Sequence, residues 1–277
     1  MAKKALIIGV NDYAPIGVGG PDLKGCVNDA LDMANTLVIC GFGVRNIRIL
    51  TNQRATKANI LRGMSWLFKN SKAGDSLVLY YSGHGTRITN FGGDYEVDGL
   101  DEAICPHDFA LGNFITDDEF RIFFNANLKP KVNLEVIFDC CHSGTGTRNL
   151  ALGLDQLNQG LKVRMIEPDA ETMFYSSYER ELGSGEIGSR ALVPVANMNH
   201  TLWAACRDQQ LSYESVISGN SRGHFTYEFC KVLRATNGNI VRSRLDSLVQ
   251  RALSRYGNGQ VNQTESLPAE FSQRIFG

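Results

Sequence analysis

A cluster of reactive side chains follows an apolar run near the middle of the chain. The segment LEVIFDCCHSGTG, residues 134–146, passes from apolar residues into Asp139, two adjacent cysteines, His142 and then small residues. A continuous apolar run of this length predicts a strand that is buried on both faces. The residues that follow it could hold a metal ion, form a redox pair, cradle a phosphate or supply a thiol nucleophile.

The spacing of these residues fits a nucleophile better than the other chemistries. Cys140, Cys141 and His142 are consecutive, so they cannot surround one zinc ion tetrahedrally without strain. Neighbouring cysteines also reach the geometry of a structural disulfide with difficulty. A phosphate cradle with five residues between Cys141 and an arginine fails, because Thr147 stands at that position and Arg148 is one residue late.

A histidine follows a second buried strand. The apolar run SLVLYYS, residues 76–82, leads into Gly83, His84 and Gly85. The carboxyl ends of parallel strands meet at one edge of a sheet, where ligands bind. Histidine moves protons near neutral pH and can activate a thiol. We therefore expect His84 to face one of the two cysteines, since adjacent residues of a strand point to opposite sides.

The elements that would position these residues alternate along the chain. Apolar runs predict strands at residues 4–10, 44–50, 76–82, 133–139 and 201–206. Helical spacing of apolar residues predicts helices at 23–38, 56–68, 117–128, 224–234 and 243–256, with Thr56 as an N-cap. This order predicts an α/β layered fold with a mainly parallel central sheet and helices on both faces. Residues 144–200 show no sustained period, and we expect a long mobile insertion there.

Composition limits the function classes. The 277 residues carry 28 Lys and Arg against 29 Asp and Glu, so no basic excess points to nucleic acid or an anionic membrane. The apolar run in MAKKALIIGV is too short for a signal peptide or a membrane span, which favours a cytoplasmic protein. Seven cysteines without a C-x-x-C pair indicate neither a zinc framework nor a disulfide scaffold. We expect Cys40, Cys105 and Cys230 to be small buried apolar residues.

Taken together, the motifs resemble those of metacaspases and caspase-like cysteine endopeptidases. The two that carry most weight are YYSGHGTR (80–87) and VIFDCCHSG (136–144), in the order and strand context of that family. Further matching segments are ALIIGVNDY (5–13), LKGCVNDA (23–30), EVDGLDEAICPHD (96–108), ITDDEF (115–120) and, less sharply, LWAACRDQQLSYE (202–214) and RGHFTYEF (222–229). The resemblance implies one caspase-like domain over 1–277, with a large-subunit-like part (1–145), an insertion (146–200) and a small-subunit-like part (201–277).

The resemblance also assigns roles to individual residues. It makes Cys141 the nucleophile and His84 the general acid or base, and it leaves Cys140 at a variable position. The backbone N–H groups of Gly83 and Cys141 would form the oxyanion hole. The first substrate pocket would be lined by Cys26, Asp29, Ser82 and Asp139. Two carboxylates in this pocket would select substrates with Arg or Lys before the scissile bond.

Three further expectations concern metals, partners and processing. The resemblance implies a calcium site at Asp101, Asp117 and Asp118, but Arg148 stands where a fourth acid is expected, so we expect no required cofactor and a weak or absent calcium site. We expect a monomer that acts on peptides or proteins and binds neither nucleic acid nor membranes. Basic residues of the insertion are candidates for self-cleavage: Arg148, Lys162, Arg164, Arg180 and Arg190.

Two alternatives remain open. One is a non-proteolytic binding or scaffold module of the same fold, against which the intact pair of Cys141 and His84 argues. The other is a redox-sensing dithiol formed by Cys140 and Cys141. The second alternative predicts that Cys140→Ser impairs the protein, whereas the peptidase interpretation predicts nearly normal cleavage.

Overall fold

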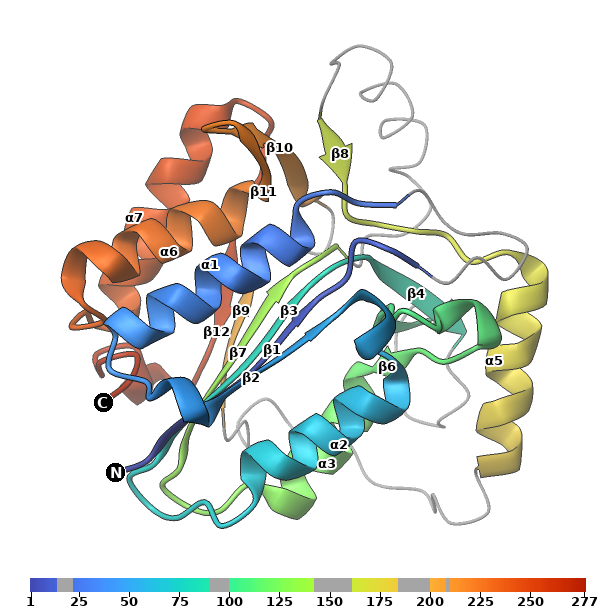
Figure 1. Cartoon of the computed structure of the whole chain (residues 1–277), viewed down its shortest axis with the longest axis horizontal. Helices are drawn as coiled ribbons and strands as arrows, with labels where there is room; N and C mark the ends of the chain where they lie inside the picture. Colours follow the sequence, from blue (N-terminus) through green and yellow to red (C-terminus); the bar gives the residue numbers. More distant parts are fainter. Residues whose placement is uncertain (14–21, 90–99, 142–160, 184–199, 208–209) are drawn as a thin grey trace.

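A six-stranded sheet forms the centre of the molecule. The computed structural model describes residues 1–13, 22–89, 100–141, 161–183, 200–207 and 210–277 (Figure 1). The strand order is β12-β9-β7-β3-β1-β2. The strands are β1 (Lys3–Gly9), β2 (Ile47–Thr51), β3 (Ser76–Ser82), β7 (Asn133–Asp139), β9 (Thr201–Ala204) and β12 (Gln263–Glu265). All neighbouring pairs are parallel except β12 with β9 at the edge.

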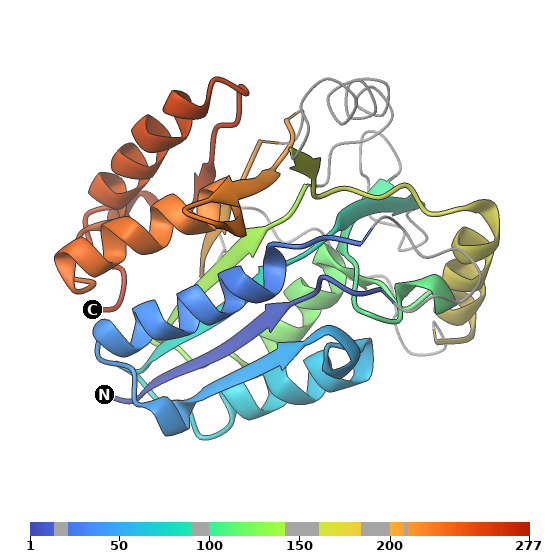
Figure 2. The ribbon, with the colours of Figure 1, turned by 45° about the horizontal axis from the view of Figure 1, so that its top comes forward.

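Helices cover both faces of this sheet (Figures 1 and 2). On one face lie α1 (Cys26–Ile39), α6 (His224–Thr236) and α7 (Arg242–Leu253), and on the other lie α2 (Lys57–Phe68) and α3 (Asp117–Asn127). Alternate residues of β1 point to the two cores: Ile7 belongs to the first and Leu6 to the second. The sheet is thus buried on both faces, as continuous apolar strands require, and the predicted α/β architecture is confirmed.

Two small sheets stand beyond the carboxyl edge of the central sheet. One contains β4 (Gly85–Thr89), β5 (Leu100–Ile104) and β6 (Ile115–Thr116); the other contains β8 (Lys162–Val163), β10 (Tyr213–Ile217) and β11 (Asn220–Gly223). Helix α5 (Ala170–Gly183) lies at the side of the molecule near β4 (Figure 1). Short 3-10 turns are η1 (Val44–Asn46), η2 (Asn52–Arg54), η3 (Phe109–Leu111), η6 (Ser254–Tyr256) and η7 (Pro268–Glu270).

Local sequence signals explain where several helices begin. Thr56 caps α2 as predicted, because its hydroxyl accepts a hydrogen bond from the N–H of Asn59 at 3.3 Å. Thr116 and Glu119 form a reciprocal capping box at the start of α3. The described part of the chain has no helix long and apolar enough to cross a membrane.

The region expected to lack regular elements contains both β8 and α5. Helix α5 leaves Phe174 and Tyr175 64% and 44% exposed, so its apolar residues do not form the one-sided stripe by which a helix is recognised. Strand β8 has two residues and is too short for a periodic pattern. The insertion thus contains two regular elements, although its sequence shows no sustained period.

A buried ion pair connects the central sheet to α7. The carboxylate of Glu135 on β7 accepts hydrogen bonds from the Arg242 guanidinium at 2.5 and 3.0 Å and from the Trp203 indole N–H at 2.7 Å. All three side chains are buried. Burial raises the pKa of Glu135 to about 7, against the attraction of Arg242. Removal of one partner would leave the other charge without compensation in the core.

We predict that Arg242→Ala lowers the free energy of unfolding by about 3–5 kcal/mol, because Glu135 then stays buried without its cation. Urea denaturation at pH 8 measures the change. The matched control is Arg244→Ala, on an exposed position of the same helix, and it should shift the free energy by less than about 0.5 kcal/mol. Equal effects of the two substitutions would contradict the role given to the buried pair.

Candidate active site

The register of two central strands brings the predicted reactive residues together. Ser82, the last residue of β3, pairs with Asp139, the last residue of β7. One residue further along, the N–H of Gly83 donates to the carbonyl oxygen of Asp139 at 3.4 Å. His84 and Cys141 therefore leave the sheet from adjacent strand ends, as the sequence predicts.

The two neighbouring cysteines lie in different surroundings. Cys140 packs into the core on the side of Tyr81 and Cys105, and burial raises the pKa of its thiol well above the ordinary value. Cys141 lies in a separate cluster, where its Sγ accepts a hydrogen bond from the N–H of Ser212 at 2.5 Å. Cys140 is thus a buried thiol that resists ionisation, and Cys141 lies on the side of Arg164 and Ser212. All seven cysteines are buried free thiols.

The backbone of His84 is held from both sides by tyrosines. Its N–H donates to the Tyr13 hydroxyl at 2.6 Å, and its carbonyl oxygen accepts from the Tyr81 hydroxyl at 2.7 Å. Burial raises the pKa of both phenols well above the ordinary value, so both stay protonated. The Cβ of any other residue at Gly83 would collide with the Tyr81 hydroxyl, which explains the glycine before His84.

A fully buried arginine of the chain itself, Arg164, fills an acidic pocket beside Cys141. Its Nη2 lies 2.6 Å from Asp29 Oδ2 and 3.2 Å from Glu214 Oε2, and its Nη1 lies 2.9 Å from Asp139 Oδ2. Nη1 also donates to the Ser82 hydroxyl at 2.9 Å. The guanidinium is therefore bound by three carboxylates and one hydroxyl, an arrangement suited to a planar cation.

The carboxylates of this pocket are fixed by further donors. Asp139 accepts from the Ser212 hydroxyl at 2.7 Å and from the Thr226 hydroxyl at 2.6 Å. Asp29 accepts from the N–H of Gly223 at 3.0 Å. Burial raises the pKa of Asp29 to about 7, while the Arg164 guanidinium and the Gly223 N–H favour its charged form. The pocket thus keeps its shape through α1, β7 and α6 together.

Two pocket residues were missed by the sequence analysis. Glu214 Oε1 and Oε2 accept from the N–H groups of Lys24 and Gly25 at 2.8 and 3.1 Å, which fixes the third carboxylate. Gly223 lies so close that a Cβ there would collide with Asp139 and Arg164. Both lie in segments that resemble the family, LWAACRDQQLSYE and RGHFTYEF, but neither was given a role. Of the predicted lining, the structure brings together Cys26, Asp29, Ser82 and Asp139: the Cys26 thiol lies 3.8 Å from Glu214 Oε2.

The backbone carbonyl group of Arg164 is bound by two N–H groups from different strand ends. Its carbonyl oxygen accepts from the N–H groups of Cys141 and Gly85, both at 3.1 Å. Strand β8, just before Arg164, pairs antiparallel with β10. Cys141, one of the two N–H donors expected in an oxyanion hole, thus donates to the carbonyl oxygen of Arg164. The N–H of Gly83 donates to the carbonyl oxygen of Asp139 instead, and the expected oxyanion hole of Gly83 and Cys141 stays a prediction.

The calcium site implied by the resemblance involves three aspartates of the described chain, Asp101, Asp117 and Asp118. In the described ranges, no group of three or more His, Cys, Asp or Glu side chains could hold a metal. Asp118 is paired with Arg121 on the next turn of α3. Asp101 and Asp117 are described as well, and Arg148 lies outside the described residues. No step of the chemistry below is routed through a metal.

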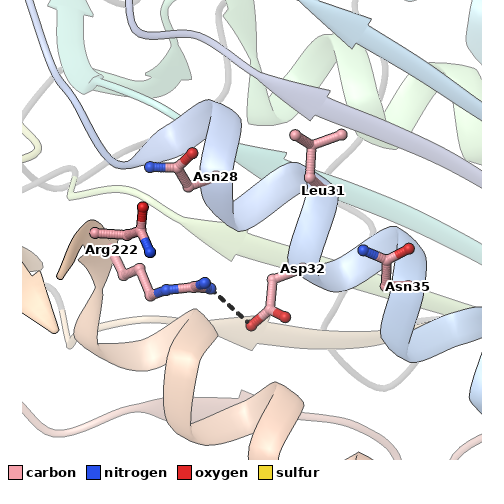
Figure 3. A pocket seen from close by; sticks show the side chains of 6 residues that line it. Asn28, Leu31, Asp32, Asn35 and Arg222 are labelled. Carbon is pink, nitrogen blue, oxygen red and sulfur yellow. Dashed lines mark ion pairs between the residues drawn. The ribbon is translucent and has the colours of Figure 1, made fainter. Parts of the chain in front are cut away.

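A pocket of about 180 Å³ opens away from this site, on the outer side of α1 (Figure 3). Asp32 and Arg222 form an ion pair of 3.1 Å across it (Figure 3). Its other lining residues are Asn28, Leu31, Asn35 and Asn220. Asp32 is also bound by Arg234 at 2.8 Å, so these charges stabilise the packing of α1 against α6 and β11.

Comparison with known proteins agrees with this geometry. The family described as "Metacaspase, peptidase C14 domain" matches residues 3–149. The chain belongs to the metacaspase family. Metacaspase-1A of Aspergillus niger and metacaspase-1 of Emericella nidulans are 30% and 32% identical to it, each over 92% of this chain and 68% of their own length. The crystal structure of a Geobacter sulfurreducens protein superposes with a TM-score of 0.75 at 25% identity, over 100% of this chain and 98% of the other.

Membership in this family makes the chain a cysteine-type endopeptidase that acts on protein substrates. It spans about two thirds of the length of the two fungal metacaspases. Family membership alone does not assign three properties of this chain. They are the nucleophile, the residue preferred before the scissile bond, and cleavage within the insertion.

We predict that Gly223→Ala closes the acidic pocket, because the added methyl collides with Asp139 and Arg164. In a Cys141→Ala background, the free energy of unfolding should fall by about 1–3 kcal/mol, and brief trypsin treatment should cut after Arg164, which is buried before the substitution. The matched control is Gly43→Ala, where no atom lies closer than 3.6 Å to the added carbon. Resistance of the Gly223→Ala chain to trypsin at Arg164 would contradict the prediction.

Proposed function

We propose that this metacaspase cleaves peptide bonds after Arg or Lys, with Cys141 as the nucleophile and His84 as the general acid and base. The observation that carries the proposal is the position of Arg164. Its side chain lies among Asp29, Asp139 and Glu214, while its carbonyl oxygen accepts from Cys141. A basic residue and the bond after it are thus held at the same time.

Charge favours basic over acidic substrates. Three carboxylates surround one cation in a region without water access, where charge-assisted hydrogen bonds are strong. An acidic side chain in the pocket would add a further negative charge to these three carboxylates. Once Arg164 has left, the described lining residues offer it no cation to pair with. A lysine reaches the same carboxylates as a point charge, but it cannot make the two-sided contact of Arg164. We therefore expect Arg to be preferred to Lys.

The proposed reaction uses groups that already surround the carbonyl of Arg164. The Cys141 thiolate attacks the substrate carbonyl carbon, and the N–H groups of Cys141 and Gly85 stabilise the negative oxygen that forms. His84 donates a proton to the leaving amine and then accepts one from the water that hydrolyses the thioester. An extended substrate would pair with β10 in the way that β8 does, through main-chain hydrogen bonds.

The proposal includes three expectations on partners and surroundings. The protein acts as a monomer in the cytoplasm, and it requires no cofactor. The pairing of Asp118 with Arg121 supports the last of these, since a carboxylate held by a cation is a poorer calcium ligand. Self-cleavage in the insertion is also part of the proposal.

The specificity is tested with fluorogenic peptides that end in Arg, Lys or Asp. We expect hydrolysis of the Arg peptide, slower hydrolysis of the Lys peptide and none of the Asp peptide. Cys141→Ala and His84→Ala should each lower kcat/KM for the Arg peptide by at least about 1000-fold, as removal of a nucleophile or its base does in other peptidases. Cleavage after Asp, or none after basic residues, would overturn the proposal.

Substitution of Cys140 distinguishes the peptidase mechanism from the redox-sensing alternative. Cys140→Ser should keep kcat/KM within about threefold of wild type, since Cys140 packs in a different core cluster from Cys141. Cys140→Ala serves as a second variant that introduces no hydroxyl into the core. Loss of cleavage in both, with unchanged circular dichroism, would favour a dithiol that uses both cysteines.

Calcium dependence is tested by chelation. The hydrolysis rate of the Arg peptide should be the same, within about twofold, in 1 mM EGTA and in calcium at about 1 mM, a concentration that saturates sites of ordinary affinity. The rate of Asp117→Asn should respond no more than wild type to either condition. A rate that rises tenfold or more with calcium, and that Asp117→Asn abolishes, would reject this expectation.

A further inference from the structure

The acidic pocket is occupied by a residue of the same chain, and the chain continues beyond it. We propose that Arg164–Met165 is the bond that this peptidase cleaves in its own chain, and that Arg164 blocks the substrate pocket until then. The inference rests on the proposed function, which it extends from peptide substrates to one identified bond. It also singles out one of the five basic residues considered for self-cleavage.

Backbone hydrogen bonds hold both sides of this bond. Before it, the N–H of Arg164 donates to the carbonyl oxygen of Ser212 at 3.1 Å. After it, the N–H of Ile166 donates to the carbonyl oxygen of Gly85, also at 3.1 Å, and Met165 lies opposite Gly85 in a parallel bridge. The carbonyl between them is held by Cys141 and Gly85. A segment that hydrogen-bonds to the site on both sides of a carbonyl group is bound in the manner of a substrate. A segment that only filled the pocket would not need the contacts after this bond.

The other described basic residues of the insertion lack this arrangement. Lys162 is part of β8, and its ammonium donates to the carbonyl oxygen of Asp22 at 2.8 Å, outside the acidic pocket. Arg180 lies in α5, where the backbone is helical and cannot pair with a strand. Arg148 and Arg190 lie outside the described residues. Among the described candidates, Arg164 alone combines a bound side chain with an extended backbone.

The same contacts make the uncut chain its own inhibitor. Arg164 and the three carboxylates around it are buried. A substrate arginine must therefore displace Arg164, which is attached to the same chain and has a high effective concentration at the pocket. Strand β8 also occupies the edge of β10 to which a substrate would pair. Blocking thus involves both the pocket and the backbone groove.

The proposed self-cleavage is an ordinary hydrolysis. The Cys141 sulfur forms a bond to the carbonyl carbon of Arg164, the bond to the Met165 nitrogen breaks, and that nitrogen takes a proton from His84. One water molecule then cleaves the thioester, which restores the thiol and leaves a carboxylate on Arg164. After cleavage Arg164 is held from one side only, and a carboxylate has replaced the neutral carbonyl beside Cys141. Both changes favour its departure from the pocket.

Intact mass spectrometry of the purified full chain tests the proposal. We expect wild type to convert into fragments 1–164 and 165–277, the second beginning at Met165, while Cys141→Ala stays at 30.5 kDa. The first-order rate should not change over a 100-fold range of protein concentration, because the bond is already at the site. Hydrolysis of an Arg peptide should begin after a lag and rise with the fragments.

Three variants locate the bond. Arg164→Lys should still be cut after residue 164, and Arg164→Gln should not be cut there. Arg190→Gln, the matched loss of a basic residue elsewhere in the insertion, should be cut like wild type. Circular dichroism and thermal melting check Arg164→Gln, because three buried carboxylates lose their cation; if it is unfolded, the wild-type fragment masses and Arg164→Lys decide.

The possible results distinguish a failure of the self-cleavage inference from a failure of the proposed function. Arg-peptide hydrolysis by a chain that is never cut at Arg164, or that is cut first at another residue, overturns this inference and leaves the proposed function in place. A cut that accelerates in proportion to concentration overturns the intramolecular step. An uncut chain that hydrolyses the Arg peptide without a lag overturns the block. Absence of both peptide hydrolysis and cleavage rejects the proposed function together with the inference.

Discussion

The structure around the active site depends on the burial of one guanidinium. Withdrawing Arg164 and the carboxylates of Asp29, Asp139 and Glu214 from water costs several kcal/mol for each ion, and the cost is offset only when every charge is paired and hydrogen-bonded. The pairing requires α1, β7 and β10 to meet at one point, although their residues are far apart in sequence. Loss of the cation from such a pocket would leave three buried carboxylates without compensation.

The central sheet supplies the rigidity that this arrangement needs. Ser82 and Asp139 occupy matching positions on β3 and β7, so His84 and Cys141 follow adjacent strand ends. The surrounding hydroxyl groups, of Tyr13 and Tyr81 in particular, fix the backbone before any substrate arrives. Preorganised donors of this type do not have to reorient during the reaction, which is the main source of electrostatic stabilisation in enzymes.

Sequence reasoning succeeded where the signal was continuous in the chain. The runs that became β3 and β7 are long, apolar and followed by reactive residues, so they could be placed from the sequence. It failed where the partner was distant or short. Glu214 enters the pocket from the middle strand of a small sheet, and nothing in its neighbours predicts that it binds the same guanidinium as Asp29. Gly83 and Gly85 are both glycines beside His84, and the sequence cannot tell that the N–H of Gly85, and not that of Gly83, is directed to the carbonyl oxygen of Arg164.

Strand β12, at the edge of the central sheet, bears on whether two copies of the chain can join their sheets. Strand β12 is antiparallel to β9 and comprises three residues, Gln263–Glu265. Its outer side offers a neighbouring molecule few unpaired backbone groups, and short edge strands are one means by which proteins avoid joining their sheets. A sheet that continued from one copy of the chain into another at this edge would have only these three residues to pair with.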